Sequence, residues 1–82
     1  MVKILILLNN QVIISKIEEV GSELGEPDCK LINPFIVKDN SILEPWISSY
    51  TIQSEFMIHS DKILTIADPR EALLEKYEKL IK

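Results

Sequence analysis

The chain has 82 residues, a net charge of −4 at neutral pH and a composition that is 46% hydrophobic. A chain of this length makes one domain, residues 1–82, whose core is marginal unless a disulfide, a metal or self-association reinforces it. The only cysteine, Cys29, excludes an internal disulfide, and with the only histidine, His59, it supplies too few ligands for a structural zinc site. We therefore expect self-association, and we expect neither a metal nor another cofactor.

The N-terminal apolar run bears on the location of the protein. Residues 2–8 are too few to cross a bilayer, and Asn9 and Asn10 follow without the small residues of a signal-peptide cleavage site. Together with the lone thiol, this predicts a cytoplasmic protein that is not bound to a membrane. The acidic net charge argues against a surface covered in nucleic acid, although it permits a small basic ring.

The first half of the sequence predicts three strands. Residues 2–8 and 11–20 are apolar, β-branched runs on either side of two asparagines, a pattern typical of a hairpin. Residues 21–28 hold both glycines of the chain and predict the clearest loop. Residues 29–38 predict a third strand in which Pro34 marks a bulge or a break, because proline has no N–H to donate to a neighbouring strand.

The second half predicts two more strands and a helix. Residues 46–59 alternate between a wetter and a more apolar face, which is typical of a long strand, and a turn separates them from a short strand at residues 62–66. From about residue 69 to residue 81 apolar side chains recur at helical spacing, with Asp68 at the position of an N-cap. The sequence thus predicts a mainly β fold of five strands over about residues 2–66, followed by a C-terminal α-helix.

No pattern of residues points to an enzyme. Cys29 and His59 would act as nucleophile and base only in contact with a third, orienting group, and a buried cysteine and a strand-end histidine explain them better. The acids around residues 21–28 lack the alternating spacing of a calcium site, and no glycine-rich phosphate loop opens a helix. Three aromatic residues share a face of the predicted fourth strand and could stack bases, although core packing explains them better: Trp46, Tyr50 and Phe56.

The segment at residues 58–66 carries a resemblance to a known family. Four residues fit the spacing of the second motif of Sm-like proteins, the family of Sm, LSm and Hfq rings: Ile58, His59, Ile63 and Ile66. Residues 32–33 (Ile-Asn) are similar to the Met-Asn pair of the first motif. The chain departs from the family in placing its helix after the last strand, and it resembles most the small, divergent members suspected to come from marine phages.

The resemblance implies a fold, an assembly and a ligand. Members bend five antiparallel strands strongly into a partly open barrel, and the fourth strand of one subunit pairs with the fifth of the next to close a ring of about five to seven copies. They bind single-stranded, often uridine-rich RNA at the pore. By this resemblance Asn33 would contact a base edge, and Leu31 would replace the stacking aromatic residue. His59, Ser60 and Lys62 would contact phosphates or bases.

Two hypotheses about function follow. The first is a ring-forming Sm-like protein that binds single-stranded RNA or DNA in nucleic-acid processing or regulation, with weak affinity because Leu31 stacks poorly. The placement of His59 and Lys62 favours it. The second is a protein–protein adaptor or scaffold ring that does not bind nucleic acid, and the net charge of −4 favours this one.

Overall fold

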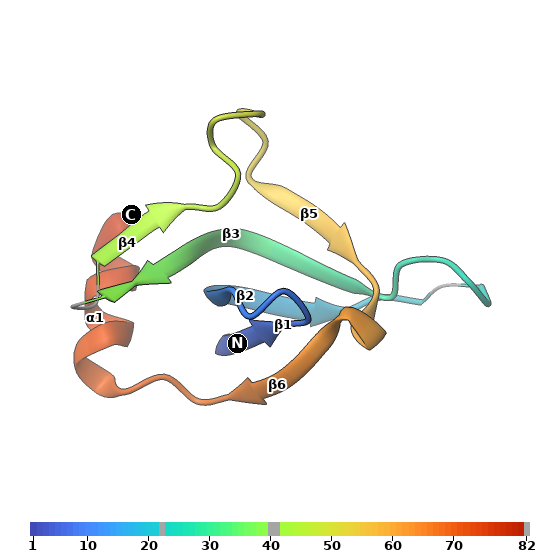
Figure 1. Cartoon of the computed structure of the whole chain (residues 1–82), viewed down its shortest axis with the longest axis horizontal. Coiled ribbons are helices and arrows are strands. Elements are labelled where there is room, and N and C mark those ends of the chain that lie inside the picture. Colours follow the sequence, from blue (N-terminus) through green and yellow to red (C-terminus); the bar gives the residue numbers. More distant parts are fainter. Residues whose placement is uncertain (22, 40–41, 82) are drawn as a thin grey trace.

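A computed structural model of the chain describes residues 1–21, 23–39 and 42–81 (Figure 1). Its elements in chain order are β1 (Val2–Leu7), β2 (Val12–Glu19), β3 (Cys29–Lys38), β4 (Ile42–Pro45), β5 (Glu55–Ile58), a 3-10 turn (Ser60–Lys62), β6 (Ile63–Ala67) and α1 (Glu71–Leu80). The predicted mainly β fold with a C-terminal helix is confirmed. No helix in the described residues is long and apolar enough to span a membrane.

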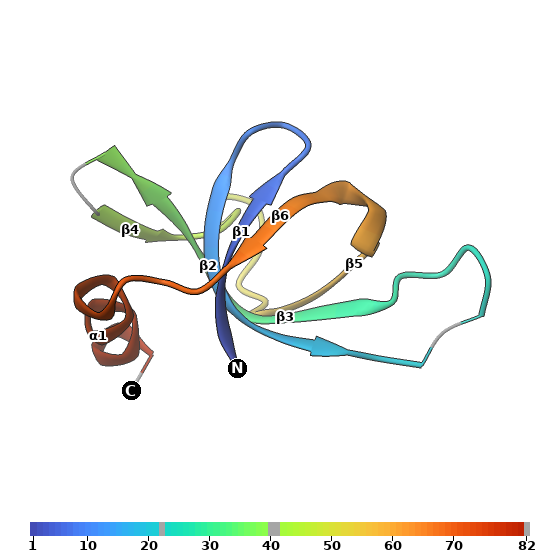
Figure 2. The ribbon, with the colours of Figure 1, turned by 90° about the horizontal axis from the view of Figure 1, so that it is seen from below.

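The strands form one antiparallel sheet of six strands instead of the predicted five. Its order is β4, β3, β2, β1, β6, and β5 pairs with the first half of β3 while β4 pairs with the second half. Within the described residues no ladder joins β5 to β6, so the sheet is neither closed nor strongly curled, and the expected partly open barrel is wrong. The two strands are consecutive in the chain, but they pair with β3 and β1 on opposite sides of β2 (Figure 2).

The third strand is interrupted where Pro34 predicts it. The register between β2 and β3 shifts there, so that Ser15 of β2 lies opposite both Asn33 and Pro34 of β3. Asn33 takes the extra position with a φ of 53°, a left-handed conformation that asparagine tolerates better than most residues. The predicted bulge is confirmed, and at the same point the outer partner of β3 changes from β5 to β4.

The long fourth strand predicted at residues 46–59 is wrong. Residues 46–50 form a turn after β4, and only Glu55–Ile58 are a strand. A straight strand would hold Trp46 and Phe56 about 33 Å apart. The loop between β4 and β5 instead brings the chain back on itself, so that the two ring centroids are 5.5 Å apart. The alternation of apolar and polar residues therefore reflects a contact across a loop and not the faces of one strand.

The core lies on β1, β2 and β3. Four side chains form its centre: Leu5, Leu7, Ile13 and Leu31. Burying a leucine or isoleucine side chain contributes roughly 1.5–3 kcal/mol relative to leaving it exposed, so these few residues supply much of the stability. Among the described residues, eleven large hydrophobic side chains remain exposed. The small core thus leaves much apolar surface exposed in a single chain.

The helix α1 is attached to the sheet through Tyr77, which is fully buried. The Tyr77 hydroxyl lies 2.9 Å from the carbonyl oxygen of Asn33 and 3.2 Å from that of Ile32, and it accepts the N–H of Lys16 at 3.3 Å. These backbone groups flank the bulge, where the shifted register leaves them without regular partners across the ladder. One hydroxyl on the helix thus satisfies polar groups that the bulge releases.

The start of the helix differs from the prediction. Arg70 is the N-cap residue, makes no side-chain capping bond and is still extended, with φ −63° and ψ 149°. The helix therefore begins too late for the predicted cap, Asp68, to reach its first N–H groups. The Asp68 carboxylate forms an ion pair with Lys3 of β1 instead.

Candidate functional site

The turn between β5 and β6 carries three of the residues predicted to bind nucleic acid. His59 precedes the 3-10 turn, and Ser60 and Lys62 lie within it. The Asp28 carboxylate fastens this turn to the loop before β3, because it accepts hydrogen bonds from the Ser60 hydroxyl and the Ser60 N–H, each at 2.7 Å. Both bonds stabilise the charged carboxylate and hold the pKa of Asp28 below its ordinary value. The bond from the Ser60 hydroxyl has the larger effect, and the bond from the Ser60 N–H has the smaller one.

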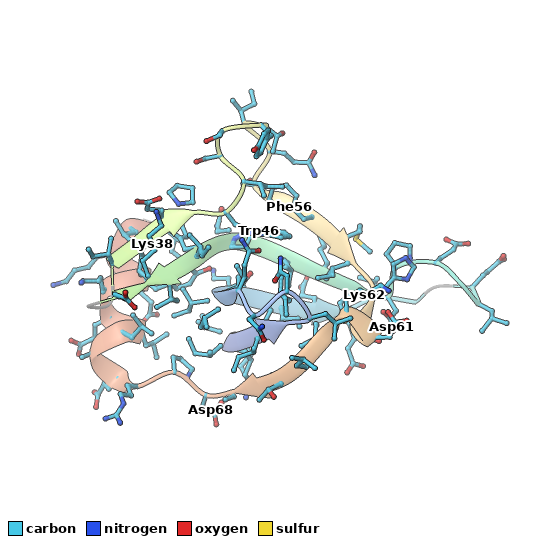
Figure 3. All side chains as sticks on the ribbon, in the orientation of Figure 1. Lys38, Trp46, Phe56, Asp61, Lys62 and Asp68 are labelled. Atoms are coloured by element: carbon cyan, nitrogen blue, oxygen red, sulfur yellow. The ribbon has the colours of Figure 1, made fainter. Side chains whose placement is uncertain are left out.

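The surface beside this turn is acidic. Six residues line a shallow pocket of about 230 Å³: Gly25, Glu26, Asp28, His59, Ser60 and Asp61. Ser60 already uses both of its donors on Asp28, so it has none left for a phosphate. The Lys62 side chain is exposed and makes no ion pair within the described part of the chain (Figure 3). In a single subunit, Lys62 is therefore the group of this turn that is available to attract an anion.

The other two predicted residues lie away from the turn. Leu31 is fully buried in the core, so it cannot touch a ligand in this fold and we remove it from the candidate site. Asn33 lies on the bulge, where its N–H donates to the Ser54 carbonyl oxygen at 2.7 Å. Ser54 precedes β5 and His59 follows it, so at about 3.3 Å per residue the extended chain from Ser54, beside Asn33, to His59 spans roughly 16 Å. One subunit does not bring them together.

Asn33 instead lines a groove of about 410 Å³ at the base of the loop between β4 and β5. Its aromatic walls are Phe35, Trp46 and Phe56, and the last two meet edge to face at an interplanar angle of 76° (Figure 3). The rest of the lining is proline, isoleucine and uncharged polar residues: Asn33, Pro34, Pro45, Ser48, Thr51, Ile52, Gln53 and Ser54. No described residue of this lining is charged.

The thiol of the chain is not placed as a nucleophile. Cys29 is buried in β3, and this burial raises the pKa of its thiol, as do the nearby carboxylates of Asp28 and Glu19. A raised pKa lowers the fraction of reactive thiolate at neutral pH. In residues 1–21, 23–39 and 42–81, no group of three or more His, Cys, Asp and Glu side chains is arranged to hold a metal ion.

Comparison with known proteins places the whole chain, residues 1–82, in a family described as a family of unknown function, DUF6561. The chain belongs to this family. No curated protein matches it. The Sm-like family does not match either, so that resemblance rests on the residues quoted above.

In this DUF6561 protein the groove is the feature that sequence reasoning missed. The aromatic residues themselves stood out, but they were assigned to one face of a long strand. Pro45, directly before Trp46, is the signal that could have found the turn, because proline has no N–H for a ladder and is confined to strand edges, starts and bulges. A strand that ends at Pro45 leaves Trp46 free to fold back toward β5.

Proposed function

We propose that this DUF6561 protein assembles into an Sm-like ring that binds single-stranded nucleic acid. The observation that carries the proposal is a pair of open sheet edges. Within the described residues β5 pairs only with β3, and β6 pairs only with β1. An edge strand offers a row of unpaired N–H and C=O groups, and pairing one edge with the other in the next copy removes both.

Apolar side chains on these two edges support pairing with another copy. Met57 on β5 is 50% exposed, and Leu64 and Ile66 on β6 are 55% and 52% exposed. Native proteins usually blunt an open edge with charged residues or proline, whereas these side chains are hydrophobic. Pairing β5 of one subunit with β6 of the next would cover them and would close a ring of about five to seven copies.

A ring would place one 3-10 turn from every subunit around a common opening. Repeating Lys62 about five to seven times there would concentrate positive charge that one subunit lacks. His59 and Lys62 would then contact phosphates or bases, and Asn33 would contact a base edge. Ser60 would act only by shaping the turn, because both of its donors are bound to Asp28. We expect weak, salt-dependent binding, since the acids beside the turn oppose it.

A second candidate function is a scaffold or adaptor ring that does not bind nucleic acid. The acidic pocket beside the turn favours it, as does the net charge of −4. Such a ring would use the same strand edges to assemble, and it would present an acidic surface to a basic protein partner.

Mass in solution, measured by size-exclusion chromatography with light scattering, tests the ring first. We expect a discrete assembly of about five to seven chains. Filter binding with oligo-uridine then separates the two functions. The variant Lys62→Ala should weaken binding about tenfold or more and reduce its dependence on salt. Lys79→Ala is the matched control, because Lys79 is an exposed lysine on α1, outside the turn, and its loss should leave binding unchanged.

Three results would contradict the proposal in different ways. A monomer would remove the ring, and the pore would go with it. A ring that does not retain oligo-uridine at low salt would favour the scaffold. A ring that binds equally well with and without Lys62 would show that the turn is not the contact surface.

A further inference from the structure

Three N–H groups of the groove beside Asn33 are already hydrogen-bonded. The Asn33 N–H donates to the Ser54 carbonyl oxygen at 2.7 Å, and the Trp46 N–H donates to the Pro34 carbonyl oxygen at 3.0 Å. The Trp46 indole N–H is also occupied, because it donates to the Gln11 side-chain oxygen at 3.2 Å. A ligand would therefore find none of these three donors free. What the groove offers is the faces and edges of its aromatic rings.

Among the described residues, some polar side chains of the groove are free, including the hydroxyls of Ser48 and Ser54 and the amide of Asn33. The side-chain amide of Asn33 makes no hydrogen bond to the described residues, although Asn33 is half-buried and held rigidly on the bulge. A primary amide presents a donor and an acceptor in one plane, which matches the hydrogen-bonding edge of a planar heterocycle. Beside it stand Trp46 and Phe56, whose rings can stack on such a heterocycle.

The absence of charge in the groove restricts the kind of ligand that it can bind. None of its described lining residues is charged, and the protein as a whole is acidic, so a phosphate or carboxylate would gain nothing by entering. Its volume of about 410 Å³ lies within the usual range for small-molecule sites, roughly 300–1,000 Å³. The occupant that fits these constraints is flat, uncharged and able to hydrogen-bond along one edge.

We propose that the groove between Asn33, Trp46 and Phe56 binds a nucleobase, presented either by a free nucleoside or by one residue of a single strand. Unstacked bases are recognised in this way, by an aromatic face and by hydrogen bonds to an edge. The groove supplies the stacking surface that Leu31, buried in the core, does not. Binding of a strand rests on the function proposed above, whereas binding of a nucleoside needs only one folded subunit.

The protein carries its own reporter for this test. Trp46 is the only tryptophan of the chain, so its fluorescence, excited beyond the absorption of the bases, reports on this groove alone. Uridine and adenosine, and separately oligo-uridine, are titrated into the full chain. We expect a saturable change in Trp46 fluorescence with at least one of the two nucleosides, and calorimetry on the same samples should give the same dissociation constant.

The variant that decides the assignment is Asn33→Gly. Glycine accepts the positive φ of Asn33, so the bulge is kept while the free amide is removed. It should weaken nucleoside binding about tenfold or more. Asn10→Gly is the matched control, because Asn10 also has a positive φ, of 66°, but lies in the turn between β1 and β2, outside the groove lining. That variant should bind as the wild type does.

The outcomes separate this inference from the proposed function. No fluorescence or calorimetric response to either nucleoside would overturn the groove assignment, even if rings form and bind oligo-uridine. Equal binding by Asn33→Gly and the wild type would overturn it too. A monomer that binds nucleosides through Asn33 would uphold the groove while removing the ring. If oligo-uridine binding is lost in Asn33→Gly but kept in Asn10→Gly, the groove receives bases from a strand.

Discussion

The centre of the sheet and its outer segments differ in how far their apolar side chains are buried and their backbone polar groups are paired. In β1, β2 and the first half of β3 the apolar side chains are buried or half-buried, and even the carbonyl groups released by the bulge are bound by Ser15 and Tyr77. From β4 to β6 each strand has one edge unpaired within the described residues, and the loop between β4 and β5 exposes Tyr50 and Ile52 almost completely. The centre therefore supplies much of the stability, and the outer segments leave apolar side chains and strand edges exposed.

Besides the backbone ladders of β4 and β5 with β3 and of β6 with β1, a few polar contacts join the two regions. Asp28 binds Ser60, Lys30 forms an ion pair with Glu55 at 2.9 Å, and the Leu8 N–H donates to the Lys62 carbonyl oxygen at 3.0 Å. Exposed ion pairs contribute little to stability, so these links position the turn more than they stabilise the fold. The contrast between the stable centre and the exposed outer segments can be tested with pairs of substitutions. Each pair replaces the same residue type once at a buried or bonded position and once at an exposed one.

The largest difference is expected between two leucines. Leu31→Ala removes a fully buried side chain from the core and should lower the free energy of unfolding by about 2–5 kcal/mol. Leu24→Ala replaces a fully exposed residue in the loop before β3 and should change the free energy of unfolding by less than about 0.5 kcal/mol. Urea denaturation at one protein concentration measures both. Similar losses for the two variants would contradict the assignment of stability to the centre.

A smaller difference is expected between two tyrosines. Tyr77→Phe keeps the buried ring but leaves backbone groups at the bulge without their partner, which should cost about 1–3 kcal/mol. Tyr50→Phe, on the exposed loop, should be close to neutral. Burial raises the pKa of Tyr77, so its contribution is present below the ordinary pKa of 10.0 and is lost as the pH rises through the raised value. As the pH rises above 10.0, the wild type should therefore lose stability more steeply than Tyr77→Phe, which lacks the ionisable hydroxyl. Unfolding at alkaline pH, followed by circular dichroism, measures the difference.

The smallest effect concerns Asp28, which lies near the solvent. Its lowered pKa means that its contribution to stability is present above the ordinary value of 3.8 and is lost as the pH falls through the lowered one. Asp28→Asn should therefore flatten this acidic part of the stability profile, as measured by thermal unfolding at several pH values. Asp61→Asn removes a charge from the same turn without removing a hydrogen bond among the described residues. An identical profile for the two variants would show that the Asp28–Ser60 bonds do not form in solution.

Local patterns predicted much of the fold. The asparagine pair between two apolar runs predicted the hairpin of β1 and β2, and Pro34 predicted the bulge of β3. The spacing of apolar residues predicted α1, although the cap was misplaced because Asp68 pairs with Lys3. Alternation alone could not tell a strand from a loop that folds back, so residues 46–59 were misassigned and β4 was missed.

The candidate site was predicted less well than the fold. The sequence correctly placed a turn before the last strand, although it put Lys62 in that strand and the structure puts it at the end of the turn. It could not show that Asp28 occupies both donors of Ser60, because the two residues are 32 positions apart. Leu31 was misassigned because the same apolar residue type serves both a core and a ligand surface, and only burial distinguishes them.

The sequence by itself determined the first three strands, the last strand and the helix, because each depends on residues a few positions apart. The tertiary structure alone decided which distant groups meet. It set Tyr77 of the helix on the bulge of β3, fastened the turn at Ser60 to Asp28, and folded Trp46 onto Phe56 beside the free amide of Asn33. These contacts join residues from separate elements, so they arise only when the sheet order brings those elements side by side.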